Sequence, residues 1–594
     1  MILLLFGCWI DAIDATDPAS CEATAESCNG EDDDCDGQID EGVMAGGYED
    51  DDGDGWGEEE DWVQACELPA DVVDRAGDCD DLNPSVHPEA VEVTGDGIDQ
   101  DCDGQELCLE DQDNDGAVSG GTVVSEDLDC MDIGEAPSTA TELDCDDDDA
   151  DVNPQAQEIC DDGVDNDCSG DHLSCLMSGT YRVQDAALGW EGGPADGLAY
   201  DVAVGDLTGD GLAEVILGTY SSDAVVAYAF RGPPSGDLSG ATAKVVDEGS
   251  LAGARVAVVP DVDGDGLAEL FVTHYQGGPQ GEGALYRFSG LASGTVDLDT
   301  AEGVLVGEAP GDMASEVAGL GDIDGDGLGD LVVGAWDAAP GNMAHAGAAY
   351  LVLGPVTSTE RLSQPWTGED IGGLAGIAVA GADLDGDGRE DMVVAAQETD
   401  RAGDDSGAVY LLREPEGGGL LTDADAVLEG QAGSRFGSAL ATGDVDGDGQ
   451  ADLVVGANCA GTGCTGAAWV FAGPIDGVVG LGDATAELRG AQPDDRAGYA
   501  IGVGDLDGDG VEDVVMTALY TDEGGSDGGA VYIAYGPPAG TLYATDLPRL
   551  LGSEGQALGN NVAVGDVDGD GKEDLVVGAL GDGGSAWLWM GQGF

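Results

Sequence analysis

The stretch "GDVDGDGQADLVVG", residues 443–456, places Asp444, Asp446, Asp448 and Asp452 within nine positions and then becomes apolar. Carboxylates that converge without a cation repel one another. The sixth position is glycine, which allows the sharp turn that brings oxygen ligands from positions 1, 3, 5 and 9 onto one ion. Oxygen ligands favour Ca²⁺ over transition metals, and Mg²⁺ rarely occupies an all-protein cage. The stretch therefore predicts a calcium loop that leads directly into a strand.

The same nine-residue loop occurs seven times, first 55 residues apart and then at five spacings of 61 residues. The first copy has Thr208 at position 3, so we expect its site to be the weakest. The alternative is a row of Asp-Gly turns without metal. The predicted ligands are Asp206, Thr208, Asp210 and Glu214; Asp261, Asp263, Asp265 and Glu269; Asp322, Asp324, Asp326 and Asp330; Asp383, Asp385, Asp387 and Asp391; Asp444, Asp446, Asp448 and Asp452; Asp505, Asp507, Asp509 and Asp513; and Asp566, Asp568, Asp570 and Asp574.

Each repeat also has the same pattern around its loop. A short alternating segment precedes the loop, an apolar run such as "DLVVGA" follows it, and a G-x-x-aromatic segment comes about 20 residues later. A fourth segment, such as "ATAELRG", leads into the next repeat. Four short strands per repeat and a fixed period of this length are typical of propeller blades. The sequence therefore predicts an all-β fold, a seven-bladed β-propeller over residues 178–594.

This part of the chain resembles the FG-GAP (VCBS-type) repeats of the integrin α-subunit propeller and its bacterial relatives. The resemblance rests on the loop signature in all seven repeats, on Phe436-Gly437 in "SRFGSALATGD" and on Ala-Gly-Tyr at 497–499. It implies calcium binding and adhesion or recognition of a protein or glycan on the propeller faces. The last repeat lacks its fourth strand, so we expect residues from about Thr180 to Leu188 to close the ring as the outer strand of the seventh blade.

The amino-terminal region differs in composition, with twelve cysteines between Cys21 and Cys175. "DCDDLNPSVHPEAVEVTGDGIDQDCDG" (78–104) parallels 144–170, and "YEDDDGDGWG" (48–57) parallels 109–118. These segments resemble MopE-like metal-binding repeats, which implies units at 48–104 and 105–175 after a linker with a half-unit at 9–47. The expected first ligands are Asp50, Asp52 and Asp54, and Asp111, Asp113 and Asp115. A second expected cluster is Asp78, Asp80, Asp81, Asp99 and Asp101, mirrored by Asp144, Asp146, Asp147, Asp165 and Asp167.

Calcium is favoured in this region too. Copper prefers imidazole or sulfur ligands; the region has only His87 and His172, in unrelated positions, and we expect its cysteines to be oxidised. The alternative is a disordered acidic stalk. Disulfides and ions must supply most of the order, because hydrophobic residues are few.

The fifteen cysteines indicate an oxidising compartment outside the cytoplasm. Cys459 and Cys464 can pair with each other, and Cys8 is left over. "LFGC" before and including Cys8 (segment 1–8) resembles a bacterial lipobox, which implies lipidation and an outer-membrane anchor; the alternative is a leftover thiol in a clipped signal of a secreted protein. Thr94 stands where Cys160 stands in the later unit, so Cys102 needs another partner, for which Cys108 is a candidate.

The formal net charge of −110 excludes sequence-independent binding to nucleic acid and makes cations the natural partners. No stretch of about 20 apolar residues is present, so membrane association is expected only through a lipid anchor. The chain has four histidines and neither HExxH nor GxSxG. We therefore expect a non-enzymatic calcium-binding protein of the cell envelope or exterior. The alternative is an envelope enzyme or accessory subunit with a catalytic site on the propeller face.

Overall fold

The structure is a computed structural model that divides into two compact units, Met1–His172 and Leu173–Phe594, described separately below. Cys8 and the rest of the predicted lipobox lie outside the described residues. In the part that is described, no helix combines the length and apolar character needed to cross a membrane. The described residues are 25–33, 38–40, 42–140, 143–150, 152–154, 156, 168, 179–193, 196–220, 225–232, 234, 236–247, 252–290, 293–415 and 417–591.

The carboxy-terminal unit is built from strands, as predicted, and its described residues form seven sheets of four or five strands. We number the sheets 1 to 7 after the loop that each contains. Sheets 1 to 3 are β11 (Leu198–Gly205), β12 (Glu214–Thr219), β13 (Val225–Phe230), β14 (Ala243–Val246) and β18 (Gly294–Asp297); β15 (Arg255–Val259), β16 (Glu269–His274), β17 (Ala284–Ser289), β19 (Gly303–Val306) and β23 (Thr359–Arg361); and β20 (Ala314–Gly319), β21 (Leu331–Ala335), β22 (Ala348–Val352), β24 (Trp366–Thr367) and β28 (Gly419–Leu420). Sheets 4 and 5 are β25 (Ala375–Ala382), β26 (Asp391–Ala396), β27 (Ala408–Leu412), β29 (Ala426–Glu429) and β33 (Gly477–Gly480); and β30 (Phe436–Gly443), β31 (Asp452–Ala457), β32 (Ala467–Phe471), β34 (Ala486–Arg489) and β38 (Gly540–Tyr543). Sheets 6 and 7 are β35 (Ala497–Gly504), β36 (Asp513–Ala518), β37 (Ala530–Ala534), β39 (Arg549–Leu551) and β9 (Thr180–Arg182); and β40 (Leu558–Gly565), β41 (Asp574–Ala579), β42 (Ser585–Trp589) and β10 (Leu188–Glu191).

The second strand of each sheet follows directly from the loop. In β31 every residue is buried, which explains the continuous apolar run after the acidic loop. A strand covered on both faces needs apolar side chains on both faces rather than alternation. In the first strand of sheet 5, β30, the first two residues are buried and the others are half-buried.

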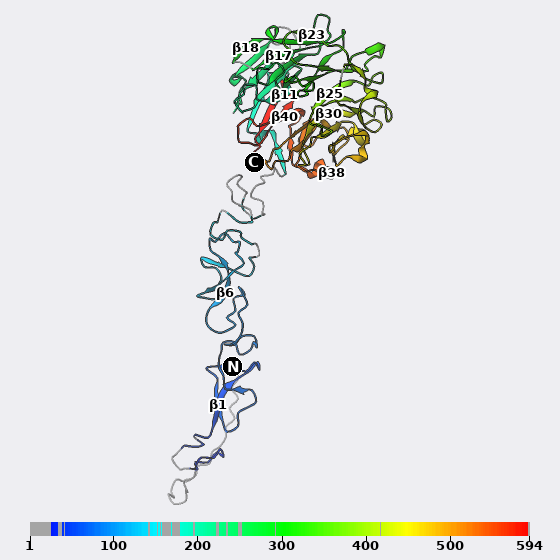
Figure 1. Cartoon of the computed structure of the whole chain (residues 1–594). Helices are drawn as coiled ribbons and strands as arrows, with labels where there is room; N and C mark the ends of the chain where they lie inside the picture. The colour runs from blue at the N-terminus through cyan, green and yellow to red at the C-terminus, as the bar shows by residue number, and fades with distance from the viewer. Residues whose placement is uncertain are drawn as a thin grey trace, which may run out of the picture. The chain divides into compact units, whose positions relative to one another are not determined.

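The first strands of the seven sheets are the innermost, and each contacts the first strand of the next sheet. The order is β11, β15, β20, β25, β30, β35 and β40, and β40 in turn contacts β11. These two strands come from opposite ends of the unit and lie side by side at its centre (Figure 1). The inner strands therefore form a closed ring.

Hydrophobic cores lie between neighbouring sheets. One cluster joins Val454 of sheet 5 to Met516 and Tyr532 of sheet 6, and all three side chains are fully buried. Another joins Trp190 and Val215 to Val576 across the junction of sheets 7 and 1. Each sheet therefore depends on both neighbours for the burial of its faces.

The closure of the ring differs from the prediction in one respect. The outer strand of sheet 7 is β10, which pairs antiparallel with β42 at residues 188–191 rather than 180–188. β9 pairs in parallel with β39 of sheet 6 instead. The reason is a pattern that most repeats follow: in five of the six five-stranded sheets among the described residues, the fifth strand lies just before a short helical turn and pairs in parallel with the fourth strand, as β18 does with β14. Four strands per sheet were predicted, and this fifth strand was missed.

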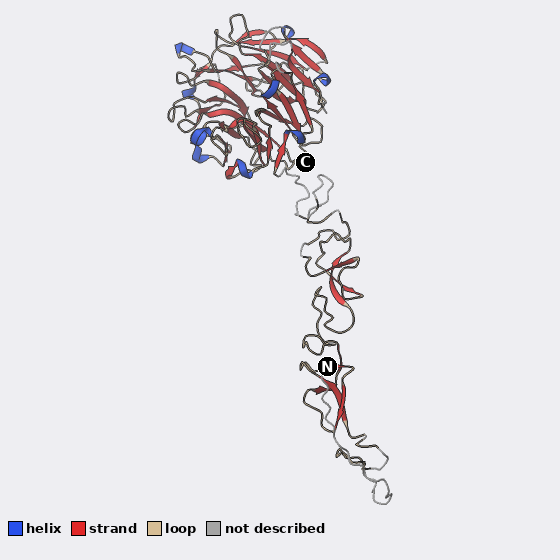
Figure 2. Cartoon of the chain, turned by 180° about the vertical axis from the view of Figure 1, so that it is seen from behind, coloured by secondary structure: helices blue, strands red, loops and turns tan. Residues whose placement is uncertain are grey.

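Helices are short and few in the described part of the chain (Figure 2). Several of them connect the added fifth strand to the fourth strand of the next sheet. They are η1 (Val183–Asp185), η2 (Leu238–Gly240), η3 (Leu298–Thr300), η4 (Pro340–Asn342), η5 (Leu421–Asp423), η6 (Ala460–Cys464), η7 (Leu481–Asp483), η8 (Ala544–Asp546) and η9 (Gly581–Gly583).

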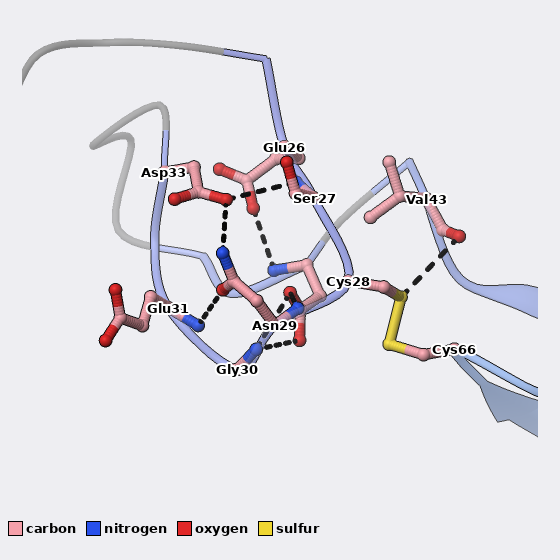
Figure 3. The surroundings of a disulfide bond; sticks show 10 residues. Glu26, Ser27, Cys28, Asn29, Gly30, Glu31, Asp33, Val43 and Cys66 are labelled. Atoms are coloured by element: carbon pink, nitrogen blue, oxygen red, sulfur yellow. Dashed lines mark hydrogen bonds between the residues drawn. A yellow bond between two sulfur atoms is a disulfide. The ribbon is translucent and has the colours of Figure 1, made fainter.

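The amino-terminal unit has little regular structure and small sheets. Its strands are β1 (Ala45–Glu49), β2 (Gly57–Glu58), β3 (Trp62–Ala65), β4 (Val72–Val73), β5 (Ala76–Asp78), β6 (Glu106–Asp111), β7 (Thr122–Ser125) and β8 (Gly134–Ala136). Figure 3 shows how a disulfide ties residues 25–33 to the end of β3: Cys28 bonds Cys66, and beside it Asp33 accepts hydrogen bonds from the Ser27 backbone (3.2 Å) and from Asn29 Nδ2 (2.8 Å).

The other disulfides among the described residues are Cys79–Cys102, Cys108–Cys130, Cys145–Cys168 and, in the carboxy-terminal unit, Cys459–Cys464. The suggested bond between Cys102 and Cys108 is wrong. Cys79–Cys102 and Cys145–Cys168 each span 23 residues, so the repeat keeps this bond in both units. Thr94 therefore does not change the partner of Cys102.

Candidate metal centres

Each predicted calcium loop connects the first and second strands of a sheet, and its hydrogen bonds explain its shape. In the fifth loop, Asp444 accepts backbone hydrogen bonds from Asp448 (3.0 Å) and Gly449 (2.8 Å). Asp446 accepts from the Asp448 backbone at 3.1 Å. Gly449 has φ 86°, a left-handed conformation that favours glycine. The spacing of aspartates and glycines thus curls the backbone around the position 1 carboxylate.

The position 9 carboxylate is buried in every loop, and it is the first residue of the second strand except in the third loop, where Asp330 directly precedes β21. In the fifth loop Asp452 Oδ2 accepts from the Val445 backbone at 3.1 Å, and Oδ1 accepts from the Gly473 backbone at 3.0 Å. The same two contacts recur for Asp513. Position 9 is therefore held in place from both sides by backbone amides.

Burial raises the pKa of these carboxyl groups. The pKa is raised to about 6 for Asp452, about 8 for Asp513 and about 6 for Asp574. A carboxylate in such a place is stabilised when a cation lies beside it. The third, fifth, sixth and seventh loops fit a hard divalent cation, because each offers only oxygen donors and, over the described residues, no arginine pairs with them. In the sixth loop the charge of Lys572 also acts on Asp507.

The remaining three loops differ. In the second loop, ligand oxygens of Asp261, Asp263, Asp265 and Glu269 all lie within 4.8 Å of one another. The buried guanidinium of Arg287 contacts two of these side chains. Arginine side chains also reach the first and fourth loops. The prediction that the first loop differs from the rest through Thr208 did not anticipate these contacts.

The amino-terminal unit brings its predicted ligands together differently from the prediction. Asp50, Asp52 and Asp54 form a turn like those of the propeller loops, with Gly53 and Gly55 donating backbone hydrogen bonds to Asp50. Asp78 and Asp81 join this group, with oxygens within 4.8 Å of Asp52. Asp78 and Asp81, which were predicted to belong to a separate cluster, therefore lie in the same group as Asp50, Asp52 and Asp54.

The second repeat has the matching arrangement. Asp111 accepts hydrogen bonds from the backbones of Asn114 and Gly116, and Asp147 accepts from the Gln112 backbone at 3.3 Å, as Asp81 does from Asp51. Buried carboxylate oxygens without a hydrogen-bond partner occur in both groups: Oδ2 of Asp52, Asp54 and Asp78, and Oδ2 of Asp113, Asp115, Asp144 and Asp147. Seven such oxygens in two matching groups fit a cation with oxygen ligands.

The rest of the predicted second cluster lies elsewhere. Asp99 accepts hydrogen bonds from the backbones of Asp103 and Gly104, which makes a separate turn with Asp101. Asp103 was not among the predicted ligands, although "DQDCDG" (99–104) repeats the D-x-D-x-D-G pattern. Asp80 donates its backbone amide to Asp78, and Asp146 does the same to Asp144. Asp165 and Asp167 lie outside the described residues.

A cavity of about 450 Å³ lies where the seven inner strands begin. Its lining includes one equivalent residue from each strand, six positions before the first aspartate of each loop: Tyr200, Arg255, Glu316, Ile377, Ser438, Tyr499 and Asn560. These equivalent positions differ in chemistry, whereas the loops and core strands repeat. The loops follow the other end of the same strands. The cavity is therefore a second, separate candidate site.

Comparisons with known proteins agree with this division of the chain. A family model described as "Putative metal-binding motif", of the MopE type, matches residues 14–41, 78–106 and 144–172. A model described as "FG-GAP-like repeat" matches 383–455 and 505–577. The groups Asp50–Asp54 and Asp111–Asp115 precede the matched motifs.

Similar curated proteins include integrin alpha-PS5 of Drosophila melanogaster, 31% identical over 219 residues, which is 35% of this chain and 20% of that protein. Integrin alpha-IIb of Mus musculus is 33% identical over 161 residues (25% and 16%). Phosphatidylinositol-glycan-specific phospholipase D of Rattus norvegicus is 34% identical over 175 residues (27% and 20%). The chain thus spans about a fifth or less of the length of these relatives.

Among solved structures, one chain of "Crystal structure of BBS1N in complex with ARL6DN, soaked with mercury" matches 70% of this chain over 97% of its own length, at 12% identity and a TM-score of 0.39. That likeness is too distant to support any conclusion. The matched motifs and the integrin similarity are more specific. The chain combines MopE-like metal-binding repeats with FG-GAP repeats like those of integrin α chains.

Proposed function

We propose that this protein is a non-enzymatic, calcium-binding protein of the cell surface or exterior, in which a seven-bladed β-propeller recognises a protein or glycan ligand. The observation that carries the proposal is the closed ring of inner strands, each of which ends in a copy of the same acidic loop. A single acidic turn is common without metal. Seven equivalent turns with a buried carboxylate at the same place, four of them without an arginine contact over the described residues, support a cation as the ligand.

Calcium is the ion that best suits these donors. The loops contain neither histidine nor cysteine, so soft and borderline metals lack their preferred ligands. Carboxylate and carbonyl oxygens on a flexible turn match the irregular coordination of Ca²⁺ better than the octahedron that Mg²⁺ demands. The bound ion would supply positive charge that fixes the turn between two strands. The same donor chemistry applies to the aspartate groups of the amino-terminal unit.

Recognition is supported by the cavity at the start of the inner strands. Repeats that preserve their core and loops have diversified here, since the equivalent lining positions include Tyr200, Arg255, Glu316 and Asn560. Pockets of a few hundred Å³ with a few placed polar groups are typical binding sites. The similarity to integrin α chains is consistent with adhesion or recognition outside the cell. We propose an envelope location, with lipidation of Cys8 as the anchor.

Binding to a glycan array and to purified matrix proteins tests the proposal. The full chain would be compared with Tyr499→Ala, which alters the cavity, and with Val478→Ala, a 66% exposed control on β33. We expect a ligand that binds the parent and Val478→Ala in calcium and binds Tyr499→Ala at least tenfold more weakly. A ligand that binds all three equally would place recognition elsewhere.

The anchor has its own test. Expression from the native start with a labelled fatty acid should label the parent chain and leave Cys8→Ser unlabelled. Equal labelling of both, or of neither, would refute lipidation at this residue.

A further inference from the structure

The side chains of three of the thirteen arginines in the chain contact carboxylates of the predicted calcium loops. Arg287 lies in the third strand of sheet 2, and Arg231 and Arg413 directly follow the third strands of sheets 1 and 4. In a chain with a net charge of −110 and only 15 basic residues, this placement is selective. It separates the seven loops into two kinds.

The second loop shows the arrangement most clearly. Arg287 Nη1 donates to Asp263 Oδ2 at 2.7 Å and to Glu269 Oε1 at 3.1 Å. The side chain of Arg287 is 2% exposed, and that of Glu269 is fully buried. Ser289 Oγ adds a contact of 2.8 Å to the same oxygen of Asp263. One guanidinium nitrogen therefore bridges positions 3 and 9 of the loop.

This bridge conflicts with a bound metal ion. Positions 3 and 9 are two of the four side chains that would surround the ion, and their oxygens are already directed at a positive charge. A dication inserted there would face the guanidinium across a few ångströms in a buried place, where like charges repel strongly. Arginine keeps its charge at all ordinary pH values. The second loop therefore does not fit the ion that the sequence motif implies.

In the first and fourth loops an arginine contacts one loop carboxylate, at a more exposed place than in the second loop. Arg231 Nε donates to Asp210 Oδ2 at 2.9 Å, and position 3 of this loop is Thr208 rather than a carboxylate. Arg413 Nε lies 3.0 Å from Asp385 Oδ2, while its Nη2 donates to the Ile475 carbonyl at 2.7 Å. The arginine is thus held from a neighbouring segment as well as by the loop.

Sheets 3, 5, 6 and 7 have no arginine directly after the third strand, where Arg231 and Arg413 lie in sheets 1 and 4. The residue after the third strand is Leu353 in sheet 3, Ala472 in sheet 5, Tyr535 in sheet 6 and Met590 in sheet 7. Leu353 corresponds to Arg413, because Val352 and Leu412 pair with Leu331 and Met392 at matching positions of the second strands. A single residue after the third strand therefore distinguishes loops 1 and 4 from loops 3, 5, 6 and 7.

We propose that arginine is a built-in counter-ion of the first, second and fourth loops, so that these three loops take no calcium and only the third, fifth, sixth and seventh do. This inference rests on the proposed function that the loops bind calcium. It makes sheets 1, 2 and 4 independent of calcium and leaves sheets 3, 5, 6 and 7 dependent on it. A chain that reads as seven calcium sites would then carry four in this unit.

Counting bound calcium in the full chain by elemental mass spectrometry, after dialysis against a low calcium concentration, tests the proposal. Asp446→Ala and Asp263→Ala remove position 3 from the fifth and second loops. We expect Asp446→Ala to lose one ion per chain and Asp263→Ala to lose none. Loss of one ion from each variant would overturn the role of arginine. No loss from either would refute calcium binding by the loops, and this inference with it.

A gain and a loss of the arginine complete the test. Leu353→Arg, at a position that is 44% exposed, places a guanidinium beside the third loop and should remove one ion. Arg287→Met should add one ion to the second loop. If Arg287→Met does not fold, Leu353→Arg still decides: an unchanged count in a folded Leu353→Arg protein would contradict the proposal.

Discussion

Replacement of Trp190 by alanine should open the ring of sheets. Trp190 lies on β10, the strand from the start of the unit that completes sheet 7, and its side chain is fully buried against Phe230, with ring centroids 5.1 Å apart. A buried tryptophan removes about 150–250 Å² from water, which at about 25 cal/mol per Å² corresponds to about 4–6 kcal/mol. Large-to-small changes in cores cost about 3–5 kcal/mol. We expect a loss in this range.

Urea unfolding of the calcium-loaded chain, followed by hydrogen exchange of individual segments, measures the effect. Trp190→Ala should lower the midpoint and speed exchange in β10 and in β42, which is almost 400 residues away in sequence but paired with β10 at Gly189 and Trp587. Val478→Ala, on an exposed site, should cost less than about 0.5 kcal/mol. Equal midpoints for the two variants, or faster exchange confined to β11 and β12, would refute this account of closure.

Three further predictions concern charges and disulfides. In calcium-stripped protein, burial raises the pKa of Asp513 to about 8, above the unfolded value of about 3.9, so the stability that this group contributes is present at low pH and is lost as the pH rises towards 8. The melting temperature should therefore be higher at pH 5 than at pH 8, and Asp513→Asn should reduce the difference. Equal melting temperatures at the two pH values would contradict the burial of this carboxyl group. Arg287→Met in stripped protein should lose about 3–5 kcal/mol, because it leaves buried carboxylates without their partner, and unfolding at the parent's midpoint would contradict this. Non-reducing digestion and mass spectrometry should recover Cys79 linked to Cys102, and a peptide linking Cys102 to Cys108 would show the pairing to be wrong.

The repeats made most of the carboxy-terminal fold predictable. An apolar run such as "DLVVG" after an acidic turn predicts a strand and its burial. The regular 61-residue spacing of the loops predicts that each repeat forms one sheet. The fifth strands were missed because β18 and its equivalents are short and exposed, and their pairing with the preceding sheet depends on packing between repeats. The expected closing strand was displaced for the same reason.

Only those parts of the candidate sites that lie within one short stretch of sequence could be predicted. Ligands within one nine-residue loop are close in sequence, so their convergence follows from the turn itself. Arg287 comes from a strand 18 residues beyond Glu269, and its approach depends on strand register, which the pattern of the loop does not contain. Asp78 reaches Asp52 through the fold of a region with little hydrophobic content, where periodicity gives no guide.

Hydrogen exchange of residues 443–456 in the full chain, calcium-loaded against calcium-stripped, tests the central claim most directly. At free calcium about 100 times the Kd, binding stabilises a site by about 2.7 kcal/mol, which corresponds to about 100-fold slower exchange through local opening. We predict that removal of calcium speeds exchange in this loop and in β31 by about that factor, and that adding calcium back restores protection. Equal exchange in both states would show that these carboxylates are not calcium ligands.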